Sequence, residues 1–63
     1  MKFHKHSEGG VTLFMVAGKD AAKALTRMEG MKVPASVNHY AKTTVIIVND
    51  KNAPAIEEEL QRR

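Results

Sequence analysis

Two apolar runs dominate the pattern of hydrophobic and polar positions along the chain. They cover residues 11–17 (VTLFMVA) and 43–48 (TTVIIV), and turn-forming residues follow each of them. Short, nearly continuous runs of strand-forming residues predict central β-strands. A weaker strand pattern precedes each run, at residues 2–6 and 33–40. The sequence therefore predicts four strands, arranged as two hairpin-like pairs.

A helical pattern follows each of the two strong strands. The apolar residues of each pattern fall on one helical face; they are Ala21, Ala24, Leu25 and Met28 in the first helix, and Ala53, Ile56 and Leu60 in the second. Asp20 and Asn52 stand where an N-cap is expected, and Gly30 stands where the first helix should end. Pro54 suits the first turn of the second helix. We thus predict helices over residues 21–29 and from about residue 53 onward.

The predicted order is ββαββα in a single α+β domain that spans residues 1–63. Antiparallel hairpins and right-handed crossovers favour one four-stranded antiparallel sheet of order 1-2-4-3 with both helices on one face. Shifting the chain by 32 residues aligns Thr12 with Thr44 and Val16 with Val48, so residues 1–30 and 33–63 form a pseudo-repeat. The arrangement resembles a circularly permuted ferredoxin-like fold, and this architectural resemblance implies no function.

The two central strands are apolar on both faces, although two helices can cover only one face of the sheet. Side chains alternate between the faces of a strand, so an uncovered face would expose several large apolar groups. We expect the interface face to carry Phe14, Val16, Ile46 and Val48. If the helices cover Phe14 and Ile46 instead, the interface consists of Leu13, Met15, Val45 and Ile47, because a phase change of one residue exchanges the faces.

The short length of the chain makes it difficult to stabilise the domain with one face of the sheet uncovered. A chain of 63 residues buries a small core, and it has no cysteine that could form a disulfide or a thiolate metal site. A covering layer supplied by a second copy would stabilise such a domain, so we expect a homodimer. A different protein that covers the same face is the alternative.

The charge pattern is mildly basic, with a formal net charge of +3. Lys19, Lys23 and Arg27 recur at intervals of four, which places them on one exposed side of the first helix, and Lys32 follows it. A solvated helix face is the plain interpretation of such a series. The functional interpretation is a surface that binds phosphates or an acidic protein.

Catalytic and cofactor motifs are not found in the sequence. No phosphate-binding loop or nucleophile elbow occurs, so we expect neither an enzyme nor a bound cofactor. His4 and His6 share one strand face and His39 joins them only across two subunits, which is too few ligands to predict a metal site. No apolar run is long enough to cross a bilayer, and without export signals or cysteine we expect a cytoplasmic protein.

The sequence therefore predicts a small, basic, non-enzymatic interaction protein. We expect a homodimeric regulator or inhibitor that binds a protein with an acidic surface through its sheet and its basic helix. Proteins this short are often accessory factors, including ones carried by phages or plasmids. The alternative is a nucleic-acid-binding protein that contacts phosphates through Lys19, Lys23, Arg27 and Lys32.

Overall fold

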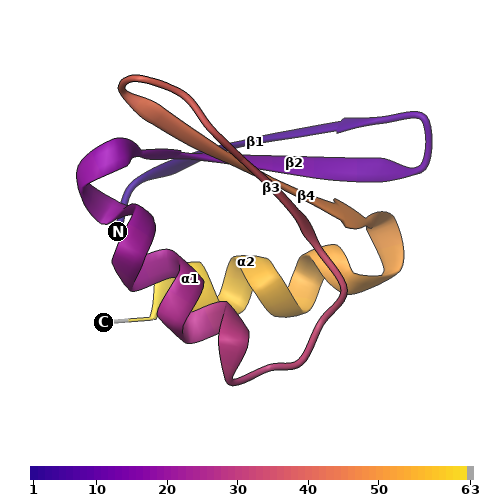
Figure 1. Ribbon diagram of the computed structural model, residues 1–63. Coiled ribbons are helices and arrows are strands. Elements are labelled where there is room, and N and C mark those ends of the chain that lie inside the picture. Colours follow the sequence, from indigo (N-terminus) through magenta and orange to yellow (C-terminus); the bar gives the residue numbers. More distant parts are fainter. Residues whose placement is uncertain (63) are drawn as a thin grey trace.

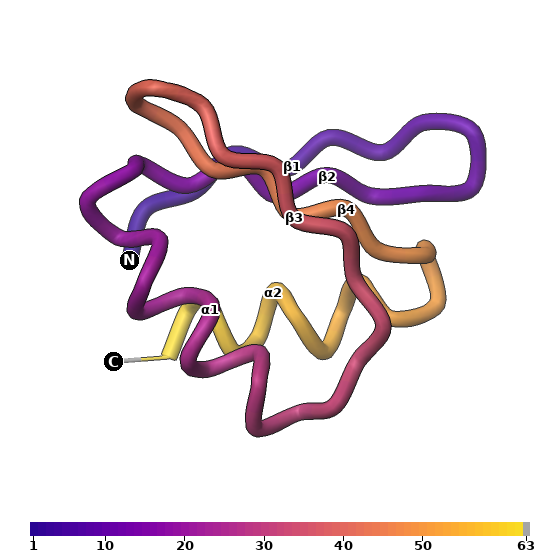
Figure 2. The backbone as a smooth tube through the Cα atoms, in the orientation of Figure 1, coloured from indigo at the N-terminus to yellow at the C-terminus, as the bar shows by residue number. Residues whose placement is uncertain are grey.

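The computed structural model describes residues 1–62 as one sheet with two helices packed beneath it (Figure 1). The order along the chain is ββαββα, as the sequence predicts, and the sheet is antiparallel with strand order β1-β2-β4-β3. The elements are β1 (Phe3–Glu8), β2 (Val11–Ala17), α1 (Ala21–Glu29), β3 (Ser36–His39), β4 (Thr43–Asn49) and α2 (Ala53–Gln61), with the 3-10 turns η1 (Gly18–Asp20) and η2 (Asp50–Asn52). Both helices lie on the same side of the sheet, and the two ends of the described chain lie near each other (Figure 2).

The two central strands follow the same pattern of burial. In both β2 and β4, half-buried and fully buried side chains alternate along the strand. The buried positions include Phe14 and Ile46, which are both 0% exposed and are paired across the two strands. Ala24 and Met28 of α1 and three residues of α2 pack with them to complete the core. The helices thus cover the face of the sheet that holds Phe14 and Ile46.

This core corrects the first choice of interface face. Phe14, Val16, Ile46 and Val48 were expected on the open face, but each is at most 2% exposed and lies under the helices. The alternative phase is the one observed, so Leu13, Met15, Val45 and Ile47 point to the open side. Because both faces of the two central strands are apolar, the sequence pattern of these strands does not indicate which face the helices cover.

The hairpin between β1 and β2 is tighter than the sequence suggests. Gly9 and Gly10 both have positive φ, at 58° and 86°, as a two-residue type I′ turn requires. Ser7 and Glu8 lie beyond the predicted strand of residues 2–6, but they continue β1 and pair with Thr12 and Val11. The longer β1 covers six residues of one sheet edge.

The helix ends also differ from the expected capping pattern. Neither Asp20 nor Asn52 makes a side-chain capping bond, because each sits in the helical conformation at the end of a 3-10 turn that leads into the helix. Gly30 follows α1 with an ordinary φ of −66°, and Lys32 takes the left-handed conformation with φ 55°. Pro54 lies in the first turn of α2, as predicted.

The second half of the chain repeats the first half at a constant offset. β4, η2 and α2 begin 32 positions after β2, η1 and α1, and they have the same lengths. The backbone contacts that close the two ends of the sheet repeat as well: Gly18 N–H donates to Lys42 O at 2.9 Å, and Asp50 N–H donates to Gly10 O at 3.1 Å. A pseudo-two-fold axis therefore relates the two β-strand, turn and helix units.

Candidate functional site

The open face of the sheet carries a continuous band of aliphatic side chains. We call this band the aliphatic stripe; it consists of Val11, Leu13 and Met15 of β2 and Val45 and Ile47 of β4. Met15 is paired with Val45, and Leu13 is paired with Ile47. All five side chains are half-buried, because their neighbours on the sheet shield them while no helix lies over them.

Polar residues of the two edge strands border the aliphatic stripe. On β1, His4 is paired with Met15 and His6 with Leu13, so both imidazoles lie on the open face beside the stripe. On β3, Ser36 and Asn38 are paired with Ile47 and Val45. An apolar centre with a polar rim is the usual anatomy of a protein–protein interface.

Charge is distributed unevenly along the β1 border. Lys2 directly precedes β1 at one end, and Glu8 closes the strand at the other, with His4 and His6 between them. The Glu8 carboxylate lies 3.4 Å from His6 Nε2. Because alternate residues of a strand share a face, the open face has a positive end and a negative end along this edge.

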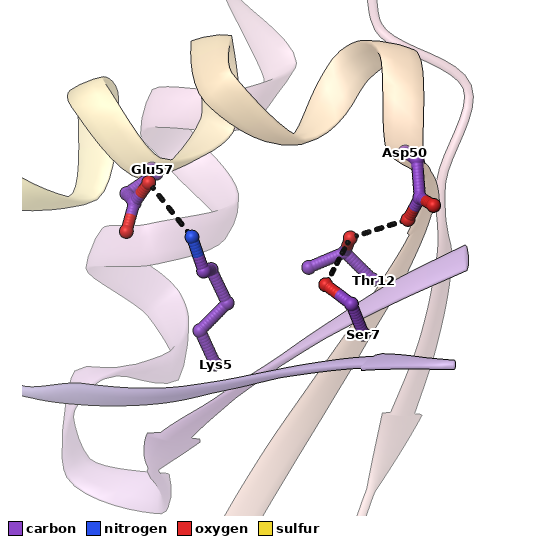
Figure 3. Close-up of polar contacts among 5 residues, drawn as sticks. All are labelled: Lys5, Ser7, Thr12, Asp50 and Glu57. Atoms are coloured by element: carbon purple, nitrogen blue, oxygen red, sulfur yellow. Dashed lines mark hydrogen bonds and ion pairs between the residues drawn. The ribbon is translucent and has the colours of Figure 1, made fainter. Parts of the chain in front are cut away.

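Contacts on the opposite side of β1 hold this edge strand against α2 and η2 (Figure 3). Lys5 Nζ donates to Glu57 Oε1 at 3.2 Å, which ties β1 to α2. Thr12 donates its hydroxyl hydrogen to Asp50 Oδ1 at 2.7 Å, and its hydroxyl lies 3.0 Å from that of Ser7. These bonds fix the position of the strand that presents His4 and His6 on the other face.

Arg27 has a structural role that the sequence does not indicate. Its Nη1 donates to Glu59 O at 3.1 Å and to Arg62 O at 2.6 Å, at the C-terminal end of α2. Carbonyl groups at a helix C-terminus lack partners within the helix and carry partial negative charge, so a guanidinium there is favourable. Arg27 therefore joins α1 to the end of α2 and is half-buried.

The other predicted basic residues are exposed, but they do not form one cluster. Lys19 lies in η1 before α1, Lys23 is in its first turn, and Lys32 lies beyond its far end. A nine-residue helix is about 13 Å long, so Lys19 and Lys32 are well separated. Lys42 instead lies near Lys19, because its carbonyl accepts the Gly18 N–H bond. The basic surface is thus concentrated at the η1 end of the molecule.

A cavity of about 690 Å³ lies at this same end of the sheet. Its apolar wall includes Met1, Phe3 and Met15, and Lys2 and Lys42 stand at its border. His4, Thr43 and Gln61 supply the other polar side chains of its lining.

The structure separates the third histidine from the other two. His39 Nδ1 lies 3.2 Å from the buried Thr44 hydroxyl, on the helix side of β3, whereas His4 and His6 lie on the open side of the opposite edge strand. Among residues 1–62, no group of three or more His, Cys, Asp or Glu side chains could hold a metal ion. Two exposed imidazoles are too few for a structural zinc site.

Comparison with known proteins gives no match for this chain. No protein-family model matches the chain, and no curated protein or solved structure is significantly similar to it. In the part of the chain that the structure describes, neither helix has the length and apolar character needed to span a membrane. The open face of the sheet and the charges around it are the features of the chain that bear on its function.

Proposed function

We propose that this chain is a small, non-enzymatic interaction protein that binds another protein through the open face of its sheet. The aliphatic stripe carries this proposal, because it is a continuous apolar surface with no helix above it. Regulation or inhibition by covering a partner's surface is the activity that such a domain can perform without catalytic groups. The cytoplasmic location expected from the cysteine-free sequence belongs to the same proposal.

The energetics of the stripe support a partner. Complete burial of one large aliphatic side chain contributes about 1.5–3 kcal/mol, so covering five half-buried ones offers several kcal/mol. A domain of this length has a total stability of roughly 3–9 kcal/mol. A partner on the open face would therefore change the free energy of the domain substantially.

The charge distribution supports an acidic partner. Lys19 and Lys23 are exposed, and Lys42 adds positive charge at the same end of the molecule. Charge of this kind speeds the encounter with an acidic protein more than it raises affinity. We assign these lysines to the attraction of an acidic protein to the η1 end of the molecule, a role separate from that of the aliphatic stripe.

Nucleic-acid binding is the second candidate, and it has less support. Arg27 is bonded to carbonyl groups at the end of α2, and Lys32 lies away from the η1 end. Two of the four residues predicted to contact phosphates therefore do not join the basic surface at that end. Tyr40 is the exposed aromatic side chain in the described chain, at 63% exposure. Stacking on single-stranded bases usually uses several aromatic side chains.

An affinity experiment from lysate of the source organism, with and without nuclease, distinguishes the two candidates. We expect the wild-type chain to retain a protein after nuclease treatment and Leu13→Lys to lose it, because a charge then stands within the stripe. Thr26→Lys, which places the same charge on the exposed side of α1, is the matched control and should retain the protein. Circular dichroism verifies that both variants fold.

Two results would contradict the proposal. Retention of the same protein by Leu13→Lys would mean that the open face is not the contact surface. Recovery of nucleic acid alone, lost on reversing Lys19 and Lys23 to Glu, would favour the second candidate instead.

A further inference from the structure

We infer that the protein that covers the open face is a second copy of this chain, packed face to face with its strands running antiparallel to those of the first. This inference rests on the proposed function, because it names the partner of the same aliphatic stripe. Its basis is the symmetry of the stripe, the charge pattern of β1 and the size of the sheet.

The aliphatic stripe is complementary to itself. Consider a two-fold axis that runs across the strands, between the row of Met15 and Val45 and the row of Leu13 and Ile47. This axis places Met15 opposite the partner's Leu13 and Val45 opposite the partner's Ile47. Each aliphatic side chain of the two rows then meets another aliphatic side chain, as an isologous interface requires.

The same axis brings opposite charges together along β1. It places β1 over the partner's β1 in the reverse direction, so Lys2 lies opposite the partner's Glu8 at both ends of the interface. His4 lies opposite the partner's His6 between these two ion pairs. Charge complementarity of this kind fixes the orientation of an interface.

The other face-to-face orientation brings like charges together. A two-fold axis along the strands keeps the basic ends of both copies on one side and places β1 over the partner's β3. Lys2 then lies near the partner's hairpin that contains Lys42, since both residues border the same end of one sheet. Repulsion between these lysines disfavours that orientation and favours the antiparallel one.

The size of the face fits a second copy. The strands have six, seven, seven and four residues in the order in which they lie in the sheet, which gives roughly 400 Å² of flat area per copy. Two such faces, enlarged by side-chain relief, approach roughly 1,000 Å², which is the lower limit for a specific interface. Two sheets packed about 10 Å apart would cover the whole stripe.

Charge exchange tests the inference on the full chain. We expect light scattering after size exclusion to give twice the 7.0 kDa mass for the wild-type chain. Lys2→Glu and Glu8→Lys should each weaken dimerisation about tenfold, because each removes two ion pairs and introduces repulsion. The double variant should restore the wild-type dimerisation constant. Lys51→Glu, an exposed change away from the open face, is the control and should leave it unchanged.

The outcomes separate this inference from the proposed function. A wild-type monomer at all accessible concentrations would overturn the self-partner, and so would a dimer that the double variant fails to restore. If the wild-type chain is a monomer while Leu13→Lys loses a protein bound by the wild-type chain, the proposed function stands with a different partner. If Leu13→Lys alters neither mass nor binding, both fail.

Discussion

Phe14 and Ile46 are paired at the centre of the β2–β4 ladder, and they are 32 positions apart along the chain. The offset between the two halves of the fold is also 32, so each of these residues takes the place of the other under the pseudo-two-fold axis. Both are fully buried beneath the helices. The centre of the core therefore lies on the axis that relates the two halves.

Phe14 and its neighbour Leu13 should respond differently to truncation, because they lie on opposite faces of β2. Phe14→Ala should lower the free energy of unfolding by about 3–5 kcal/mol, since it opens a cavity in the core. Leu13→Ala should cost the isolated chain about 1 kcal/mol or less, since Leu13 is already partly exposed. Urea denaturation of both variants measures this difference, and equal losses would contradict the face assignment.

Arg27 should stabilise the domain more than the neighbouring Lys23. Arg27→Ala removes the donor to Glu59 O and Arg62 O and should lower the free energy of unfolding by about 1–2 kcal/mol. Lys23→Ala changes an exposed position of the same helix and should alter stability by at most about 0.5 kcal/mol. Denaturation curves that do not separate the two variants would argue against the capping role.

The buried threonines Thr12 and Thr44 are equivalent under the pseudo-two-fold axis, but they have different partners. Thr12 donates to the Asp50 carboxylate and lies beside Ser7, whereas the Thr44 hydroxyl lies within hydrogen-bond distance of the His39 ring. Bonds to charged groups contribute about 1.5–3 kcal/mol, compared with about 1 kcal/mol for neutral ones. Thr12→Val should therefore destabilise the domain more than Thr44→Val does. The reverse order, measured by thermal unfolding, would contradict this prediction.

Lys32 occupies a backbone conformation that favours glycine. Its φ of 55° lies in the left-handed region, which disfavours side chains with a Cβ atom. We expect Lys32→Gly to raise the free energy of unfolding by about 0.5–1 kcal/mol, despite the greater flexibility of glycine in the unfolded chain. Lys42→Gly, at a position without positive φ, should lower it. A loss of stability in Lys32→Gly would show that its side chain contributes more than the strain.

Most of the fold could be predicted from the sequence, but the face of the central strands that packs against the helices could not. Residues 11–17 and 21–29 coincide with the predicted strand and helix, because continuous apolar runs and helical stripes are strong local signals. The choice between Phe14 and Leu13 as the core residue has no such local signal. Packing against the helices decides it, and that packing depends on contacts between residues distant in sequence.

The basic series on α1 illustrates the same limit for functional residues. Its spacing of four places Lys23 and Arg27 near one another on the helix, and this much follows from the sequence. The bonding role of Arg27 depends on the carbonyl groups of Glu59 and Arg62 at the end of α2, which lie 32 and 35 positions further along the chain. The ion pair between Lys5 and Glu57, 52 positions apart, has the same origin. Contacts of this range become visible only in three dimensions.

Contacts between two copies of the chain should come from the open face of the sheet and not from the face of Phe14. Isotope-filtered NMR on an equimolar mixture of labelled and unlabelled chains measures contacts between subunits directly. We expect intermolecular NOEs between the Met15 methyl group and the methyl groups of Leu13, and between the methyl groups of Val45 and those of Ile47. Intermolecular NOEs confined to other surfaces, or none at millimolar concentration, would contradict it.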